Sequence, residues 1–193
     1  KILTRFERSD AYLDKLITNR LKIGDLSEQD KAFLNELVNG VIRWRWKLDW
    51  VLTGFYRGDY LKCLNIIKNS LRVGLYQILF LDKIPDYAAI NETVEIVKNI
   101  QGEKIAGIVN GVLRNIARNI ENIRYPNYED DKVYYFTIIY SHPRWMVRKW
   151  LDQFGEENTI ALMEENNKIP FITIRVNKLK SSLEEILAYL NMN

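Results

Sequence analysis

The side chains of this sequence that could best support a function lie in three clusters of basic residues. Basic side chains of this kind can bind phosphate groups. The first cluster interleaves cations with indoles, which would allow charge pairing and base stacking together: Arg43, Arg45 and Lys47 with Trp44, Trp46 and Trp50. An equally favoured alternative is that the indoles pack into the core while the cations reach past them to solvent.

The second cluster combines glycines with arginines at helical spacing. Spacings of 4, 3 and 4 place its members on one side of a helix: Gly107, Gly111, Arg114 and Arg118. Glycines allow another backbone to approach closely, and the arginines could clamp phosphate. The alternative is tight packing of the glycines against a neighbouring helix, with two solvated arginines.

The third cluster contains Arg144, Arg148 and Lys149, and its arginines align at i and i+4 beside Trp145 and Trp150. Each cluster alone is a weak signal. Taken together, they give the predicted RNA-binding residues: Arg43, Arg45, Lys47, Arg114, Arg118, Arg144, Arg148 and Lys149.

Residues that could support catalysis or bind a metal are sparse. Cys63 is the single cysteine and stands among leucines and isoleucines, so we expect a buried core thiol. His142, the single histidine, is expected in a turn that begins a helix. These two residues are too few for a zinc site, and no glycine-rich phosphate or cofactor loop occurs. We therefore predict no catalytic, cofactor-binding or metal-binding residue in this chain.

The composition is that of an ordinary globular protein, with 47% hydrophobic and 27% charged residues in a chain of 193. The first twenty residues are too charged for a signal peptide and no apolar run is long enough to span a bilayer, so we expect a cytoplasmic protein without a membrane partner. Residues 1–120 hold 19 Lys and Arg against 14 Asp and Glu, a net charge of +5, which is compatible with a nucleic-acid partner without requiring one.

Helical periodicity predicts the elements that position the clusters. Residues 71–81 are apolar on nearly every side and predict the central helix of a bundle, which Pro85 should stop. Apolar residues recur at steps of three and four over 105–120, so the second cluster should lie on a helix against the core. Ser27 is predicted to cap a further helix, and the first cluster continues that helix or follows a kink.

Residues 121–131 have no apolar period and mark the predicted domain boundary, with a helical RNA-binding domain over 1–125 and a second unit over 126–193. In the second unit, Pro143 should begin a helix and Gly155 should end it.

Beyond that helix, the alternating and β-branched residues 171–177 predict a strand, and Ser181 or Ser182 should cap a last helix. The predicted fold class is therefore mainly all-α: a helical bundle, then further helices and the beginning, one strand and one helix, of a small α/β domain. A single strand without partners also leads us to expect a fragment of a longer protein.

Two segments carry a family resemblance. RVGLYQILFLDKIPDYAAINETVEIVK (72–98) and AGIVNGVLRNI (106–116) together resemble the NusB family of antitermination factors, which are all-helical RNA-binding bundles. Two features depart from that family. Arg114 stands where NusB proteins usually have an acidic residue, and the chain continues well past residue 120, where a free-standing NusB would end.

The continuation resembles a different group of proteins. The block over 140–190, which begins YSHPRWMVRKWLDQFG (140–155), is similar to the linker region of the RsmB family of 16S rRNA cytosine-C5 methyltransferases, and ELVNGVIRWRWKLDWVL (36–52) resembles a motif of the same family. The likeness extends over essentially the whole chain. It implies that the intact protein is an enzyme that uses S-adenosyl-L-methionine, with a C-terminal catalytic domain that carries two cysteines. Neither those cysteines nor the cofactor loop occurs in these residues.

Three functions remain open. The leading hypothesis is an rRNA-binding and positioning region, whose partners are 16S rRNA and the protein's own catalytic domain. The second is a free-standing antitermination factor that binds RNA and a ribosomal protein. The third is an intramolecular docking scaffold that binds the catalytic domain and contacts no RNA.

Overall fold

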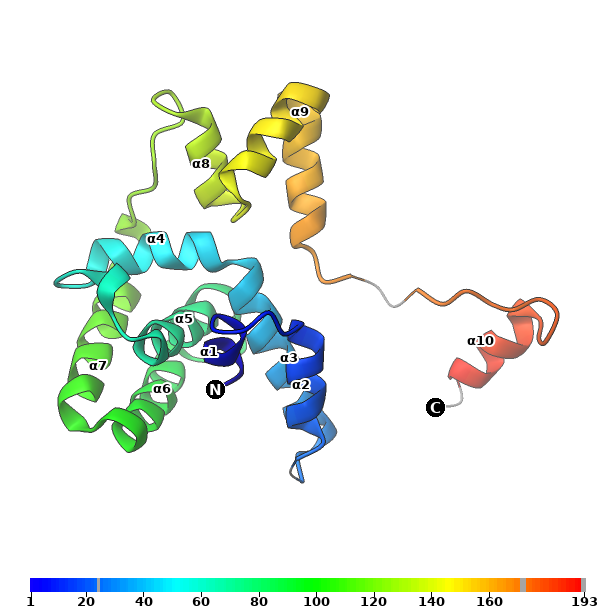
Figure 1. Cartoon of the computed structure of the whole chain (residues 1–193), viewed down its shortest axis with the longest axis horizontal. Helices are drawn as coiled ribbons and strands as arrows, with labels where there is room; N and C mark the ends of the chain where they lie inside the picture. Colours follow the sequence, from blue (N-terminus) through cyan, green and yellow to red (C-terminus); the bar gives the residue numbers. More distant parts are fainter. Residues whose placement is uncertain (24, 171–172, 192–193) are drawn as a thin grey trace.

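The structure, a computed structural model, describes residues 1–23, 25–170 and 173–191 and is built from helices (Figure 1). The first group of helices comprises α1 (Ile2–Phe6), α2 (Leu13–Leu21), α3 (Glu28–Arg43), α4 (Arg45–Phe55), α5 (Asn65–Phe80), α6 (Asp86–Gln101) and α7 (Glu103–Arg118), with short 3-10 helices η1 (Tyr60–Lys62) and η2 (Ile120–Asn122). It is followed by α8 (Lys132–Ile139), α9 (Arg144–Asn167) and α10 (Leu183–Asn191).

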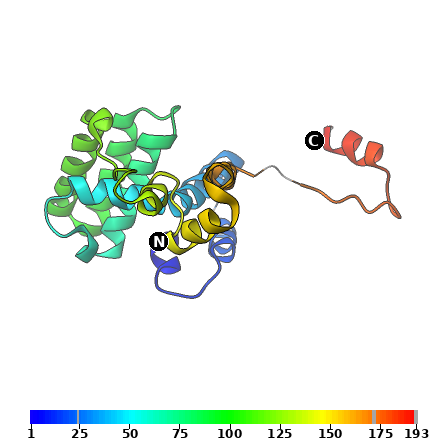
Figure 2. The same ribbon diagram turned by 90° about the horizontal axis from the view of Figure 1, so that it is seen from above.

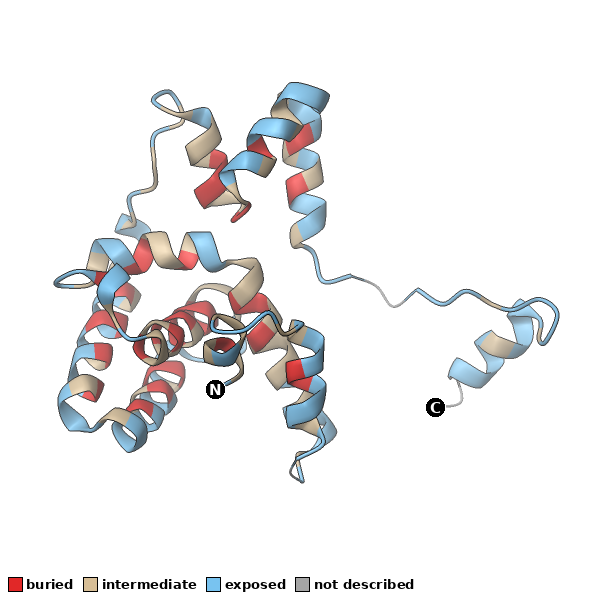
Figure 3. Cartoon of the chain, in the orientation of Figure 1, coloured by how far each residue is buried: buried red, intermediate tan, exposed pale blue. Residues whose placement is uncertain are grey.

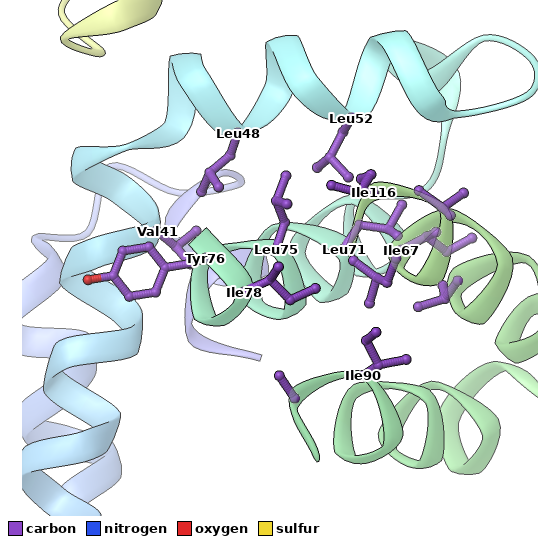
Figure 4. Packing of buried hydrophobic residues seen from close by; sticks show 14 of the residues in the cluster. Val41, Leu48, Leu52, Ile67, Leu71, Leu75, Tyr76, Ile78, Ile90 and Ile116 are labelled. Atoms are coloured by element: carbon purple, nitrogen blue, oxygen red, sulfur yellow. The ribbon is translucent and has the colours of Figure 1, made fainter. Parts of the chain in front are cut away.

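Helix α5 is the centre of the first group, as its all-round apolar pattern predicts. Leu71 and Leu75 are fully buried, and α3, α4, α6 and α7 all pack against α5 (Figure 4). Helix α7 approaches α5 closely at Gly74, where an added Cβ would lie 2.6 Å from the Leu113 side chain. The buried residues of the bundle accordingly line the inner faces of its helices (Figure 3).

The end of α5 differs from the prediction. The helix ends at Phe80, and the chain turns through Leu81–Ile84, where the Ile84 amide donates to the Leu81 carbonyl. Pro85 instead precedes the first residue of α6, a position that suits its fixed φ and needs no N–H. The proline therefore begins the next helix and does not stop the central one.

Where a helix begins at a nearby capping side chain, the structure agrees with the prediction from the sequence. The Ser27 Oγ accepts a hydrogen bond from the Asp30 amide at the start of α3. Helix α3 meets α4 at Trp44, whose φ of −95° and ψ of 15° make the kink that was one of the two predicted possibilities. At the start of α10, Ser182 accepts from the Glu185 amide and the Glu185 carboxylate accepts from the Ser182 amide, which is a complete capping box.

Helices α8 and α9 have a second, smaller hydrophobic cluster around Phe136, Val147 and Met163. Helix α9 does not end at Gly155, as predicted; it breaks there, with φ of 72°, and resumes at the next residue. The larger cluster includes Tyr125 and the smaller one begins at Tyr128. The domain boundary stays a prediction, because α8 also packs against α4.

The predicted strand over 171–177 is not confirmed by the described residues. Residues 171 and 172 lie outside the described residues, and residues 173–177 have no regular secondary structure. A strand is stable only when its backbone pairs with another strand, and the described residues offer no such partner. The mainly helical fold class is thus confirmed without the α/β element, and α10 lies apart from the other helices (Figure 2).

Candidate nucleic-acid interface

The outer face of α7 carries the second basic cluster and is open to solvent. Val109, Leu113 and Ile116 fill the inner face of the helix, so the opposite side carries the cluster. A Cβ built at Gly107 or Gly111 would meet no atom within 4 Å. The glycines therefore do not pack against a neighbouring helix, and a backbone from another molecule could reach this side of α7. We call Gly107, Gly111, Arg114 and Arg118 the α7 stripe.

The two arginines of the α7 stripe are exposed and lean along their own helix. The Arg114 Nε–H donates to the Asn110 side-chain oxygen at 2.8 Å, and the Arg118 Nε–H donates to the Arg114 carbonyl at 3.3 Å. Within the described part of the chain, neither guanidinium is ion-paired with a carboxylate. Lys104 is also exposed one turn before Gly107, a cation that the sequence reasoning missed. These charges remain available to an external anion.

The basic cluster of α4 is largely committed to internal contacts. The Lys47 ammonium lies 5.4 Å from the centre of the Trp44 ring, 5.9 Å from Phe80 and 5.3 Å from Tyr125. Burial lowers the pKa of Lys47, because the aromatic surroundings replace water. Trp44 itself stacks on Phe80 with 4.6 Å between ring centres. Trp44 thus packs inward, as the alternative expects, but Trp46 is 46% exposed and Lys47 stays among aromatic rings and does not reach past them to solvent.

The arginines of the α4 cluster lie at two different junctions. Arg45 is 3.7 Å from a Glu7 oxygen and 3.8 Å from an Asp49 oxygen, so two carboxylates already face it. Arg43 is half-buried and lines a cleft of about 450 Å³ together with Lys168 at the end of α9. Arg43 is thus less exposed than the arginines of the α7 stripe, and Arg45 differs from them in having carboxylate partners.

Beneath Arg45 lies a buried ionic network that sequence reasoning missed. Arg72 of α5 is 3% exposed and donates from Nε and Nη2 to both oxygens of Asp49, at 2.6 and 2.7 Å. Its Nη1 donates to Glu7 at 2.6 Å, and the Tyr60 hydroxyl donates to Asp49 at 2.7 Å. The signal that could have revealed the network is the position of Arg72 between Leu71 and Leu75, on the part of α5 that is buried, since a buried charge requires a partner.

The third basic cluster is divided by the structure. Arg144 pairs with Asp131 at 2.5 Å and lies over the Tyr134 ring, which ties the start of α9 to the start of α8. Arg148 and Lys149 are exposed on the outer side of α9. Of this cluster, only the latter two are placed as freely as the α7 stripe.

The turn at Ser141 and His142 joins the two groups of helices. Ser141 has a φ of 57°, and its Oγ accepts a hydrogen bond from the Trp46 amide at 3.0 Å. The residue at the N-cap of α4, Trp44, makes no capping hydrogen bond with its side chain. Ser141, which is 95 residues from Trp46 in the sequence, therefore caps the helix in its place. The His142 Nδ1–H donates to the Tyr140 carbonyl at 2.7 Å, and burial lowers the pKa of His142. His142 therefore occupies the predicted helix-entry turn.

Cys63 is not a buried core thiol. It is half-exposed in the connection between η1 and α5, where Leu61 and Leu64 are also exposed. The apolar residues around Cys63 lie on an irregular segment, so their side chains do not share one buried face. Contact with Cys63, followed by burial, raises the pKa of Tyr56 to about 12.

No three His, Cys, Asp or Glu side chains in the described ranges converge as a metal-binding group. No helix formed by those residues combines the length and the apolarity that crossing a membrane requires.

Comparison with known proteins gives two family matches. Residues 1–118 match the NusB family, and residues 142–193 match the RsmF/B-like methyltransferase, ferredoxin-like domain. The probable ribosomal RNA small subunit methyltransferase B of Bacillus subtilis is 38% identical over 96% of this chain and 41% of its own length. A protein of the same name from Synechocystis is 31% identical over 99% of this chain and 43% of its own length. The ribosomal RNA small subunit methyltransferase B of Klebsiella pneumoniae is 34% identical over 86% of this chain and 37% of its own. The chain thus spans about two fifths of the length of these relatives.

Proposed function

Because the chain belongs to the NusB family through residues 1–118, we propose that it is the rRNA-binding and positioning region of a methyltransferase. The enzyme proposed for the intact protein is a cytoplasmic 16S rRNA cytosine-C5 methyltransferase that uses S-adenosyl-L-methionine. The names of the relatives support the methyltransferase part of this proposal, and the resemblance of residues 36–52 and 140–155 supports the target base.

The residues present do not fit the methyl donor. The described glycines with positive φ, Gly58, Gly102 and Gly155, each stand alone between helical segments. None belongs to a glycine-rich loop of the kind that brings backbone amides against a nucleotide. We therefore assign cofactor binding and methyl transfer to the catalytic domain, and RNA binding to this chain.

The observation that carries the proposal is the open α7 stripe. Its glycines leave the helix backbone uncovered, and its arginines have no carboxylate partner among the described residues. An RNA backbone could lie along this side and pair its phosphates with the two guanidinium groups. Such contacts position an RNA without reading its sequence. A base selected elsewhere on the RNA could then be presented to the catalytic domain.

The catalytic domain is the second proposed partner. Helix α10 exposes about half of each of three leucines on one side: Leu183, Leu187 and Leu190. This apolar side is the surface where we propose that the rest of the protein packs, because exposed leucines at helical spacing favour burial against another element.

The test is binding of a labelled 16S rRNA fragment to the chain with Arg114→Glu and Arg118→Glu together. Loss of two phosphate contacts predicts roughly 30-fold weaker binding near 0.1 M salt, and a salt dependence that is shallower by about 1.5 units in slope. The matched control is Lys15→Glu with Lys22→Glu on α2, which changes the net charge equally on another exposed surface.

The control separates a local contact from a general charge effect. Equal weakening of both double variants would show that only net charge matters and would count against the α7 stripe. No binding of the unmodified chain at low salt would contradict the proposal altogether and would favour the docking scaffold.

A further inference from the structure

We propose that a crevice between α4 and the segment after α7 binds one unpaired nucleotide of the RNA, an inference that rests on the proposed function. The crevice has a volume of about 380 Å³. That volume falls within the range of roughly 300 to 1,000 Å³ that small-molecule sites occupy. The residues that carry the proposal are Trp50, Gly54, Phe55, Asn122, Ile123 and Arg124.

One wall of the crevice is aromatic and held in place. The Trp50 indole Nε1–H donates to the Arg124 carbonyl at 2.9 Å, and the indole makes a T-shaped contact with Tyr134, with 5.7 Å between ring centres. These two contacts fix the orientation of the indole. Phe55 is half-buried in the same crevice, and Ile123 adds apolar surface from the opposite segment. A rigid aromatic wall of this kind favours stacking of a base, because every base presents a π face.

Gly54 leaves this crevice open although the fold does not require a glycine there. A Cβ added at Gly54 would meet no atom within 4 Å, and the residue has no positive φ. Glycine inside a helix is less favourable than alanine by about 1 kcal/mol, so its presence on α4 is a cost without a packing reason. Open space for a bound ligand provides such a reason.

The rim of the crevice offers the polar groups that a nucleotide needs. The Arg124 side chain is exposed, and within the described part of the chain its guanidinium makes no hydrogen bond or ion pair. Asn122 is exposed on the same segment and could both donate to and accept from the edge of a base. No acidic side chain lines the crevice, so nothing there would repel a phosphate.

One wall of the crevice follows the α7 stripe closely along the chain. Arg118 is the last residue of α7, and η2 then brings the chain to Arg124 within six residues (Figure 1). An RNA strand held at Arg118 could therefore extend to the crevice and place a further phosphate beside the Arg124 guanidinium, a third one without a carboxylate partner among the described residues. This continuity, together with the absence of acidic residues, favours a nucleotide over a peptide as the occupant.

The experiment fills the crevice without changing any charge. Gly54→Leu places a side chain in the open space, and Gly54→Ala adds only a methyl group as a matched control. Asn99→Leu on the exposed side of α6 controls for an added surface leucine. Each variant of the full chain is titrated with a labelled 16S stem–loop, and with the same stem in which every loop base is paired.

We expect Gly54→Leu to weaken binding of the stem–loop roughly tenfold, the size of one lost base-stacking contact, and to leave binding of the fully paired RNA unchanged. Gly54→Ala and Asn99→Leu should bind both RNAs as the unmodified chain does. Arg124→Gln should weaken stem–loop binding about fivefold through one lost phosphate contact, which keeps the test valid if Gly54→Leu folds poorly.

The outcomes separate the crevice from the proposed function. If Gly54→Leu and Arg124→Gln bind the stem–loop normally while the double variant of the α7 stripe is weakened, the crevice does not hold a nucleotide and the proposed function stands. Equal losses on both RNAs would overturn the preference for an unpaired base. If the unmodified chain binds neither RNA, the proposed function fails and this inference fails with it.

Discussion

The basic cluster of α4 and the α7 stripe both carry basic side chains at the surface of a helix in the sequence pattern, yet the structure places them in opposite situations. The cations of α4 face aromatic rings and carboxylates of their own chain. The arginines of α7 face solvent beside two uncovered glycines. Charge content alone therefore does not identify a nucleic-acid interface. The difference lies in whether each cation already has a partner inside the protein.

The position of each helix explains this difference. Helix α4 is packed from two sides, by α5 of the bundle and by α8 of the second group. Charges on a helix that is packed on both sides need internal partners, because desolvation of an unpaired ion is costly. Helix α7 lies at the rim of the bundle and buries only one face, so its other face can carry free charge (Figure 3).

The largest expected effect tests the internal role of α4. Arg72→Met removes the guanidinium that pairs with Asp49 of α4 and with Glu7. Both carboxylates would lose their buried partner, so we expect the free energy of unfolding to fall by about 3 kcal/mol or more. Urea denaturation followed by circular dichroism measures this loss.

Arg45→Gln is the matched control for Arg72→Met. Arg45 reaches the same two carboxylates, but its side chain is 45% exposed and its distances are longer. Its removal should change stability by about 0.5 kcal/mol or less, as is usual for exposed pairs. If Arg45→Gln were as destabilising as Arg72→Met, the buried network would depend on Arg45. Arg45 would then be needed for stability and would not be available to bind RNA.

A smaller effect tests the contact between the two groups of helices. Ser141→Ala removes the hydroxyl that accepts from the Trp46 amide, so α4 should lose about 1 kcal/mol of stabilisation. Hydrogen exchange at the Trp46 amide should accelerate. Ser141→Asn should restore protection, because asparagine tolerates the positive φ of this residue and can also cap a helix.

Ser182→Ala provides the comparison for that result. It removes the cap of α10, which lies apart from the bundle, so exchange at Trp46 should not change. Equal acceleration in both variants would mean that Ser141 acts through general stability and not as the cap of α4.

Local signals in the sequence predicted the fold well, and long-range contacts limited the rest. The Ser27 cap, the central position of α5 and the side of α7 that bears Gly107 all follow from residues within a few turns of each other. The pairing of Arg72 with Asp49 and the Ser141 cap join residues 23 and 95 positions apart. Periodicity carries no information on such pairs.

The same limit explains why the candidate site was only partly predictable. The sequence placed the cations on helices but could not show which of them meet partners from other elements. Lys47 illustrates this, because Phe80 and Tyr125 reach it from α5 and from the segment after η2. The strand predicted over 171–177 is not confirmed for a related reason, since strand formation depends on a partner outside the segment and the described residues supply none.

The smallest expected effect provides the most direct test of the comparison between α4 and α7. Lys47→Met removes a half-buried cation that faces aromatic rings, so the lost cation–π attraction and the relieved desolvation should nearly cancel, within about 1 kcal/mol of stability. RNA affinity should stay within about twofold, whereas Arg114→Gln should weaken binding about fivefold by removing one phosphate contact. Fluorescence anisotropy with the same rRNA fragment measures both. If Lys47→Met weakened binding as much as Arg114→Gln, Lys47 would have to leave its aromatic surroundings to reach phosphate, and both clusters would belong to one interface.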